Sequence, residues 1–202
     1  MRLPNKFIMK KQIKQMIVGV SGAKGSFSEA AAREYLKKQN IKTYKLKYLI
    51  SVENVLNNLN NDKIDLGIFP IENSNGGIVI EAVHAMAKYV FNIKELFEIP
   101  VIHCLLAQKN IDKKNIKMIA SHDQALKQCK MYLKRIWPKT EIKETTDTAK
   151  AAEDLSKNIL PKTTAVIASE NCAKIYGLKI LEKGTQDLKF NFTSFLAVTK
   201  TK

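Results

Sequence analysis

Short apolar or alternating runs are separated by helix-spaced apolar positions along most of this chain. The runs are strand-sized and rich in β-branched residues, as is typical of buried strands. They comprise residues 16–20, 43–49, 64–69, 117–120, 141–146, 164–168, 178–181 and 192–198. Between them, apolar residues recur at spacings of three and four, as at Cys129, Leu133 and Ile136, which predicts amphipathic helices. The alternation predicts an α/β fold with largely parallel sheets.

Polar side chains stand where five of the predicted helices begin. Ser26 and Glu29 have the spacing of a capping box, and Ser121 and Gln124 repeat it. The five junctions are Ser26, Asn73/Ser74, Ser121, Thr148 and Ser169. The free N–H groups and the dipole at a helix N-terminus attract anions. If two lobes face each other with their strand ends, these N-termini converge on one cleft that suits a small polyanion.

A long apolar extended stretch, residues 91–108, has the pattern of a strand that crosses between two lobes. The expected division is a basic lead-in of residues 1–15, a first lobe of residues 16–92 with 185–202, and a second lobe of residues 93–184. His103 lies in the crossing stretch, and we interpret it as a core or hinge histidine in preference to a catalytic one.

The chain is strongly basic, with a formal net charge of +15 over 202 residues. A nucleic-acid partner is one interpretation of such a charge. The lysines, however, occur in every segment, aromatic residues make up only 7%, and no nucleic-acid recognition motif is present. We therefore expect a Lys-rich solvated surface that could steer an anionic substrate, and no nucleic-acid partner.

The cysteines and the apolar runs limit where the protein works. Cys104, Cys129 and Cys172 are odd in number and widely spaced within apolar patterns, so we expect reduced core thiols of a cytoplasmic protein. No cluster has metal-ligand spacing, which predicts no metal site. No run is long enough to span a membrane. Residues 1–14 lack the apolar centre and the cleavage site of a signal peptide.

Eight short motifs occur in a fixed order along the chain. They are Gly22–Glu29, Pro70–Ser74, His103–Leu106, Ser121–Leu126, Thr148–Ala152, Ile167–Ser169, Tyr176–Leu178 and Asn191–Phe195. In this order they resemble the catalytic domain of the prephenate dehydratase family, over about residues 17–198. The resemblance implies a two-lobed fold like that of type II periplasmic binding proteins, with the active site in the interlobe cleft. It also implies conversion of prephenate to phenylpyruvate, water and carbon dioxide in phenylalanine biosynthesis, without a cofactor, by a homodimer.

The resemblance assigns roles to particular residues. The family's catalytic threonine falls on Thr193, which would donate a proton to the leaving hydroxyl. Glu72, Asn73 and Gln124 fall on the family's other cleft positions. The residues expected to bind substrate are Ser26, Phe27, Ser28, Ser74, Ser121, Thr148, Ser169, Asn191 and Phe195. Each also has a plainer interpretation: Ser28 and Ser169 could only cap helices, and Glu72 could only orient the lobes.

Three departures from the family pattern bear on these roles. Ser194 stands where the family usually has an arginine that could bind a substrate carboxylate or brace the threonine, and Asp147 stands where it usually has a serine. Residues 1–202 contain neither an ACT domain nor a chorismate mutase segment. The alternatives are arogenate dehydratase, a non-aromatising prephenate decarboxylase, and a non-catalytic protein that binds small anions.

Overall fold

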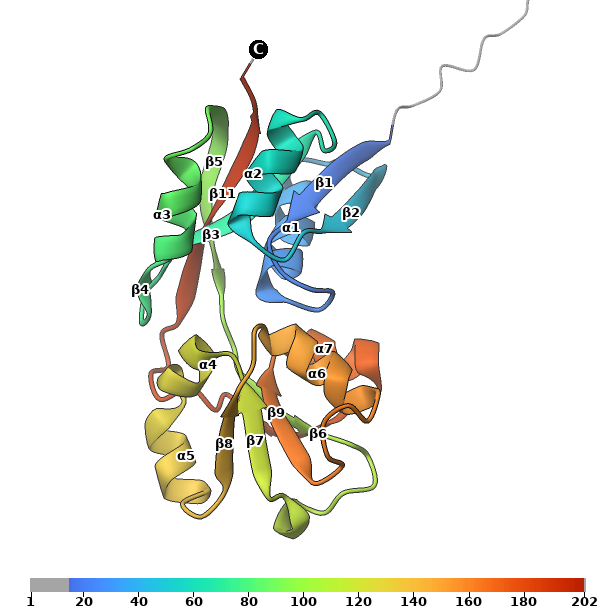
Figure 1. Cartoon of the computed structure of the whole chain (residues 1–202), viewed down its shortest axis with the longest axis vertical. Coiled ribbons are helices and arrows are strands. Elements are labelled where there is room, and N and C mark those ends of the chain that lie inside the picture. Colours follow the sequence, from blue (N-terminus) through green and yellow to red (C-terminus); the bar gives the residue numbers. More distant parts are fainter. Residues whose placement is uncertain (1–14, 202) are drawn as a thin grey trace, which may run out of the picture.

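The computed structural model describes residues 15–201, which form two lobes stacked along the long axis (Figure 1). Each lobe is a β-sheet with helices on both faces. The predicted α/β class and the two-lobed architecture are confirmed. The predicted basic lead-in falls almost entirely on residues 1–14, which lie outside the described part of the chain.

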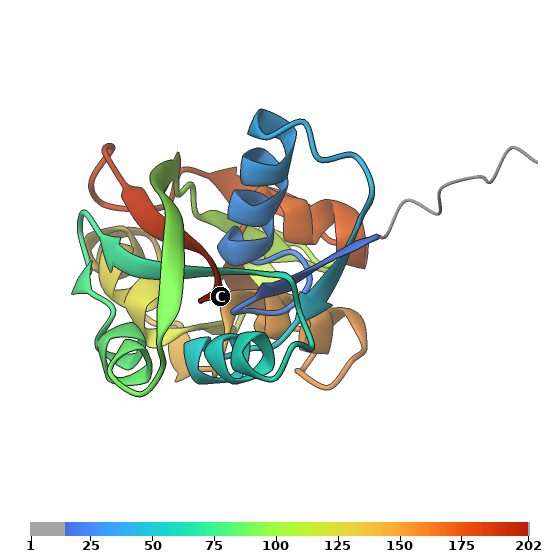
Figure 2. The same cartoon turned by 90° about the horizontal axis from the view of Figure 1, so that it is seen from above.

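Lobe 1 is built on a six-stranded mixed sheet of order β2-β1-β3-β11-β5, with β4 attached to β3. Its elements are β1 (Met16–Val20), α1 (Phe27–Lys38), β2 (Tyr44–Tyr48), α2 (Val52–Asn60), β3 (Leu66–Asn73), β4 (Gly77–Ile78), α3 (Ile80–Met86), β5 (Phe91–Pro100) and β11 (Phe192–Lys200). β1 pairs with β2 and β3 in parallel, whereas β11 is antiparallel to both of its neighbours. Helix α1 covers one face and α2 with α3 cover the other, as Figure 2 shows from above.

Lobe 2 repeats this plan with a five-stranded sheet of order β10-β6-β9-β7-β8. Its elements are β6 (Cys104–Ala107), the 3₁₀ turn η1 (Lys113–Asn115), β7 (Met118–Ser121), α4 (Asp123–Gln128), α5 (Lys130–Ile136), β8 (Glu141–Glu144), α6 (Thr148–Ser156), β9 (Thr164–Ala168), α7 (Glu170–Tyr176) and β10 (Lys179–Lys183). Helices α4 and α5 pack on one face, and α6 and α7 on the other. Because β6 is antiparallel to both β9 and β10, the expectation of largely parallel sheets was wrong, and both sheets are mixed.

The lobe boundaries differ from the sequence-based expectation. Residues 93–100 were assigned to lobe 2, but β5 pairs with β11 along its whole length and so belongs to the sheet of lobe 1. Residues 185–190 were assigned to lobe 1, but their first part lies on lobe 2. There, the Thr185 N–H donates to the His103 carbonyl at 3.0 Å, and the Asp187 carboxylate accepts the N–H groups of Met131 and Tyr132, each at 2.8 Å.

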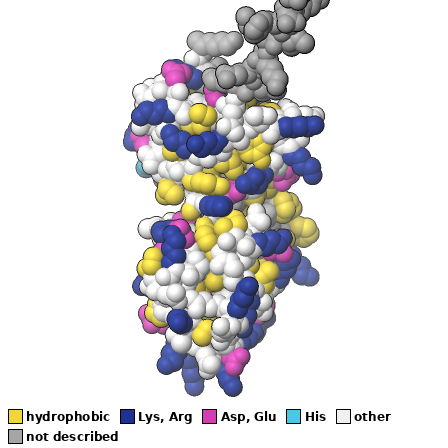
Figure 3. All heavy atoms as spheres, turned by 90° about the vertical axis from the view of Figure 1, so that its right-hand side faces the viewer, with side chains coloured by type: hydrophobic (Ala, Val, Ile, Leu, Met, Phe, Trp, Pro, Cys, Tyr) yellow, Lys and Arg dark blue, Asp and Glu magenta, His cyan; other side chains and the backbone are white. Residues whose placement is uncertain are grey.

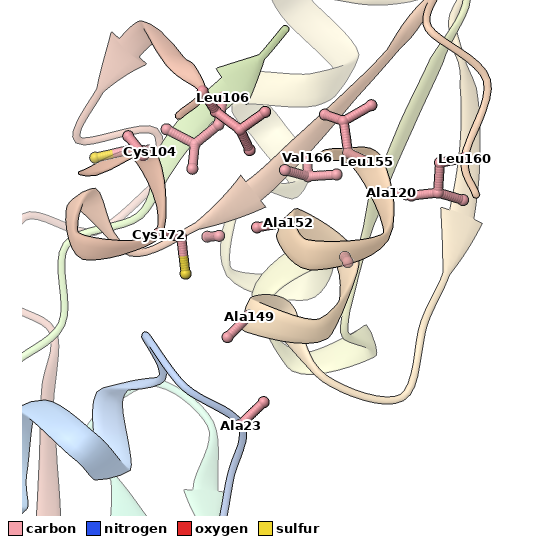
Figure 4. Close-up of a cluster of buried hydrophobic side chains, with 14 residues drawn as sticks. Ala23, Cys104, Leu106, Ala120, Ala149, Ala152, Leu155, Leu160, Val166 and Cys172 are labelled. Atoms are coloured by element: carbon pink, nitrogen blue, oxygen red, sulfur yellow. The ribbon is translucent and has the colours of Figure 1, made fainter. Parts of the chain in front are cut away.

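A loop of lobe 1, residues 21–26, is clamped against lobe 2. The Ser169 hydroxyl donates to the Gly25 carbonyl at 2.6 Å, and the Tyr176 hydroxyl donates to the Lys24 carbonyl at 2.7 Å. Ala23 is part of the core cluster of lobe 2, where it faces the starts of α6 and α7 (Figure 4). Gly25 has φ +91°, and a Cβ there would lie 2.9 Å from the Cys172 sulfur. The close approach of the two lobes therefore requires glycine at this position.

Basic side chains are spread over the surface of both lobes, as the face in Figure 3 shows. Among the residues described, no helix combines the length and the apolar character that crossing a membrane requires.

Candidate active site between the lobes

A cavity of about 440 Å³ lies between the two lobes. Lobe 1 contributes the loop after β1, the start of α1, the end of β3, the turn that leads into α3, and β11. Lobe 2 contributes α4 and the start of α6. Eight of the residues expected from the sequence line this cavity together: Ser26, Phe27, Ser28, Asn73, Gln124, Thr148, Thr193 and Phe195. The cavity is therefore the candidate active site.

Thr193 and Asn73 lie side by side on paired strands. Thr193 is opposite Asn73 in the β11–β3 register, and the Asn73 Nδ2 group donates to the Thr193 hydroxyl oxygen at 2.9 Å. Thr193 is buried at the cavity wall. Because the amide nitrogen can only donate, the threonine oxygen is the acceptor, and its own proton is left for a different partner.

Three side-chain amides close a ring behind the threonine. Asn73 Nδ2 donates to Asn191 Oδ1 at 2.8 Å, Asn191 Nδ2 donates to Gln128 Oε1 at 2.9 Å, and Gln128 Nε2 donates to Asn73 Oδ1 at 2.9 Å. Asn73 ends β3 and Asn191 directly precedes β11 in lobe 1, whereas Gln128 ends helix α4 of lobe 2. The ring thus joins the lobes at the floor of the site.

His103 stands behind Gln128 in the segment that crosses between the lobes. It is only 3% exposed, and its Nε2 lies 2.8 Å from Gln128 Oε1. The Phe27 and His103 rings are nearly perpendicular, at 85°, with their centroids 5.6 Å apart. Burial lowers the pKa of the imidazole, because a charged ring would lose its hydration, and the contact with Gln128 offsets only part of this. The interpretation as a core or hinge residue fits this burial, yet His103 also lines the cavity.

Helix starts and hydroxyls offer places for anionic groups. Ser26 caps α1, where its hydroxyl accepts the Glu29 N–H at 3.3 Å, and Ser28 follows in the first turn beside Ser21, with a 3.5 Å separation of the two hydroxyl oxygens. Across the cavity, Thr148 opens α6. Neutral N–H and O–H donors at two helix N-termini can hold carboxylates without a fixed positive charge.

Charged side chains are scarce around the cavity. Of the residues described, those that line it include no Lys or Arg, but they include Glu81 and Asp147. Both carboxylates are already engaged: Glu81 accepts the Val52 N–H at 3.1 Å, and Asp147 caps α6 by accepting the Lys150 N–H at 2.8 Å. Within residues 15–201, no group of three or more His, Cys, Asp or Glu side chains is placed to hold a metal ion.

The arginine that the family pattern places at position 194 would not point into this cavity. Thr193 and Phe195 line the cavity, and Ser194 between them faces the opposite side of β11. There, the Ser194 hydroxyl donates to Glu98 on the exposed surface of β5 at 3.1 Å. The missing arginine therefore removes no cavity-lining cation.

Five expected residues do not line the cavity: Glu72, Ser74, Ser121, Ser169 and Asn191. Glu72 is exposed on β3 and pairs with Ile78 and Ser194. Asn191 is buried in the amide ring and reaches the cavity only through its neighbours. Ser74 is exposed, and its hydroxyl accepts the Phe192 N–H at 3.0 Å.

The other two serines hold the fold together. Ser121 does not cap a helix, because β7 extends through it, and its fully buried hydroxyl donates to the Ile167 carbonyl at 2.6 Å. His122 caps α4 in its place, with its Nδ1 accepting the Gln124 N–H at 3.3 Å. Ser169 does cap α7, but its hydroxyl points to Gly25 in the interlobe clamp.

The junction at Asn73 also differs from expectation. No helix begins there, because β3 runs to Asn73 and α3 starts only at Ile80, after a tight turn. The Asn73 side-chain oxygen accepts the N–H groups of Asn75 at 3.0 Å and Gly76 at 2.8 Å, and so builds that turn itself.

Sequence reasoning missed Gln128. It lies four residues after Gln124 on the same helix, so the two side chains share one face, and both line the cavity. That spacing was the signal that could have found it. The apolar rim of Ile50, Ile78 and Ile80, each more than half exposed, carried no such signal because exposed isoleucines show no pattern in the sequence.

Comparison with known proteins agrees with this arrangement. The family model for prephenate dehydratase matches residues 18–202. The bifunctional chorismate mutase/prephenate dehydratase of Buchnera aphidicola subsp. Schizaphis graminum is 34% identical over 199 residues, which are 98% of this chain and 51% of that protein. The chloroplastic arogenate dehydratase/prephenate dehydratase 6 of Arabidopsis thaliana is 33% identical over 184 residues, which are 91% of this chain and 43% of that protein.

A solved structure of prephenate dehydratase from Arthrobacter aurescens, in complex with L-Phe, has the same fold, with a TM-score of 0.83 at 24% identity. The match covers 93% of this chain and 61% of that one. The chain thus spans about half the length of the curated relatives it matches. Since the family model extends over nearly the whole chain, this chain belongs to the prephenate dehydratase family.

Proposed function

We propose that this chain converts prephenate to phenylpyruvate, water and carbon dioxide, as a step of phenylalanine biosynthesis. The observation that carries the proposal is the pairing of Thr193 with Asn73 on the cavity wall. The Asn73 amide fills the acceptor side of the threonine oxygen at 2.9 Å. The threonine proton is then available to a leaving hydroxyl in the cavity.

The proposed reaction balances with one proton taken up. Thr193 donates its proton to the ring hydroxyl, the C–O bond breaks, and water departs. The electron pair of the bond to the ring carboxylate becomes part of the aromatic ring, and carbon dioxide is released. Solvent then returns a proton to Thr193. Aromatisation provides the driving force, so the site must mainly orient the substrate and assist the departing oxygen.

The apolar part of the cavity supports this chemistry. Phe27, Val101 and Phe195 line it, and Phe195 stacks on Phe97 with centroids 6.1 Å apart. A carboxylate placed against apolar walls is poorly solvated, which favours its loss as neutral carbon dioxide. The second carboxylate of the substrate can be held at the N-terminus of α1 or α6 by neutral donors.

The test is a turnover assay of the purified protein with prephenate and with arogenate, run side by side at neutral pH against a buffer blank. We expect phenylpyruvate to form well above the blank rate. Turnover no faster than buffer with both substrates would refute the enzyme proposal and favour a small-anion binder, which calorimetric titration with phenylpyruvate would then detect.

A second candidate function, arogenate dehydration, is favoured by the charge of the cavity. Arogenate carries an ammonium group in place of the side-chain ketone of prephenate. Of the described residues, those that line the cavity include no Lys or Arg, and Asp147 is among them. The ammonium group of arogenate would meet this negative charge where prephenate presents a neutral ketone. At a separation of about 7 Å and an effective dielectric constant near 40, the attraction between the ammonium group and the Asp147 carboxylate is about 1 kcal/mol.

The variant Asp147→Ser separates the two substrates, because serine also caps helices and so preserves the start of α6. If arogenate is preferred through Asp147, the arogenate-to-prephenate ratio of kcat/KM falls about fivefold in the variant. Asp112→Ser is the control, since Asp112 lies before η1 and outside the cavity. An unchanged ratio for Asp147→Ser would remove Asp147 from substrate choice.

We also propose that the protein works as a homodimer in the cytoplasm. The edge strand β5 supports pairing, because Ile93 and Leu96 on it are each 59% exposed. The three buried, unpaired cysteines support a reducing compartment. Light scattering of the native protein and of Leu96→Lys tests the dimer: a monomeric native protein would refute it.

A further inference from the structure

Backbone groups fix the direction of every amide in the ring of Asn73, Gln128 and Asn191. The N–H groups of Asn75 and Gly76 can only donate, so the atom of Asn73 that faces them is its oxygen. The Phe192 carbonyl can only accept, and it faces Asn73 Nδ2 at 3.0 Å. With Asn73 fixed, Gln128 must present its nitrogen to Asn73, and its oxygen therefore faces Asn191 and His103.

The same reasoning sets the tautomer of His103. Because Gln128 Oε1 is an acceptor, His103 Nε2 must carry a hydrogen. His103 Nδ1 is buried and has no hydrogen-bond partner among the described residues. A second ring proton would be a buried donor without an acceptor, so the ring is neutral and Nδ1 is bare.

The Asn73 amide also determines where the Thr193 hydroxyl proton can point. Asn73 Nδ2 occupies the acceptor side of Thr193, and Thr193 lines the cavity. The hydrogen bonds of the series His103–Gln128–Asn73–Thr193 thus all run in one direction, and each side chain donates to the next. The series crosses between the lobes, because Gln128 belongs to α4 and Thr193 to β11.

We propose that Gln128, held by the Nε2–H of His103, is the positioning residue through which lobe 2 orients the Thr193 hydroxyl toward the substrate. This inference rests on the proposed role of Thr193. Gln128 and His103 are connected to Thr193 by hydrogen bonds only through Asn73. Their loss leaves the threonine in place and removes the hydrogen bond that Asn73 receives from lobe 2. The contact between the lobes and the orientation of the proton donor then depend on the same hydrogen bond.

Substitutions at the two residues separate positioning from substrate binding. We expect His103→Phe and Gln128→Leu each to lower kcat ten- to a hundredfold and to change KM less than threefold. His103→Gln places an amide N–H near the former Nε2, and it should retain at least a third of kcat. The double variant His103→Phe/Gln128→Leu should be no slower than Gln128→Leu within twofold, because both act through one link.

Matched controls lie outside the cavity. His84 on α3 is exposed, and Gln108 donates to the Leu155 carbonyl at 2.8 Å on the far side of lobe 2. His84→Phe and Gln108→Leu should keep native kcat and KM. The proposal is overturned if His103→Phe keeps native kcat, if His103→Gln is as slow as His103→Phe, or if the losses are instead in KM.

A readout independent of turnover is the ¹⁵N NMR spectrum of the His103 imidazole in the native protein. We expect the neutral Nε2–H form, changed in Gln128→Leu. An Nδ1–H or charged ring at neutral pH would overturn the proposed polarity even if the enzyme is active. Conversely, a native protein without turnover but with the Nε2–H form would refute the proposed function and leave the amide ring standing.

Discussion

Replacing the Thr193 hydroxyl with a methyl group is the most direct test of the active site. Thr193→Val keeps the shape and the β-branching that suit strand β11. In the variant, Asn73 Nδ2 retains two acceptors, Asn191 Oδ1 at 2.8 Å and the Phe192 carbonyl at 3.0 Å. Since no buried donor is left unpaired, the free energy of unfolding should fall by only about 1 kcal/mol.

The effect on turnover should be far larger. A positioned proton donor contributes roughly 10²- to 10⁴-fold to a rate, which corresponds to about 3–5 kcal/mol of transition-state stabilisation. We therefore expect kcat with prephenate to fall at least a hundredfold in Thr193→Val. Affinity for phenylpyruvate, measured by calorimetry, should stay within threefold, because the product lacks the departed hydroxyl.

Thr199→Val is the matched control, since Thr199 lies on the same strand beyond the cavity. Urea unfolding of both variants measures the stability term, and phenylpyruvate formation measures the rate. Retention of more than a third of native kcat by Thr193→Val would refute the role of the hydroxyl. A loss of more than about 3 kcal/mol of stability would instead show that the amide ring depends on Thr193 in a way its hydrogen bonds do not account for.

Three further predictions follow from particular contacts. Ser194→Arg should leave kcat/KM within twofold, because position 194 faces Glu98 on the outer surface; a tenfold gain in the turnover assay would contradict this. Gly76→Ala should lower kcat, because its Cβ would lie 3.2 Å from Gln124 Oε1 and 3.3 Å from Asn73 Oδ1. Gly77→Ala, at φ +74° in open space, should instead cost about 1 kcal/mol of stability in urea unfolding, and equal effects of the two would disprove the distinction. Burial raises the pKa of Cys129 to about 12 and that of Cys172 to about 11 from an ordinary 9.0. The folded protein then binds more protons than the unfolded chain above pH 9, so stability should decline from there upward, and Cys129→Ala should flatten the decline in urea titrations.

Local signals predicted the helix starts at Ser26 and Ser169, because a capping hydroxyl needs only its own next turn. They failed at Ser121 and Asn73, where contacts with other strands determine the local structure. The Ile167 carbonyl takes the Ser121 hydroxyl, and β11 with β4 extends β3 through Asn73. The Ile167 carbonyl is 46 positions from Ser121, and Thr193 of β11 is 120 positions from Asn73. Periodicity within a short window cannot reveal such partners.

The residues of the candidate site likewise divide into those that sequence motifs identify and those that only the folded structure places. Ordered motifs identified the neighbourhood, and Asn73, Gln124 and Thr193 do line one cavity. The sequence could not separate residues that face the cavity from those that support it. Asn191 is one residue from β11, yet it is turned into the amide ring, and Ser194 alternates to the outer surface. That separation depends on strand register, which a single motif does not contain.

The connection between the lobes has a consequence for how this chain is assembled. Pro100 and Phe192 are partners in the β5–β11 ladder, and the Val101 N–H bonds the Asn191 carbonyl at 2.8 Å. Lobe 2 is therefore inserted between the two strands of an antiparallel pair, β5 and β11, at the position of a hairpin loop. Joining residue 101 to residue 191 through a tight turn would give a shortened chain that contains only lobe 1, with β5 and β11 connected as a hairpin. During synthesis, all strands of lobe 2 are made before β11. The sheet of lobe 1 cannot be completed until then, because β11 lies between β3 and β5.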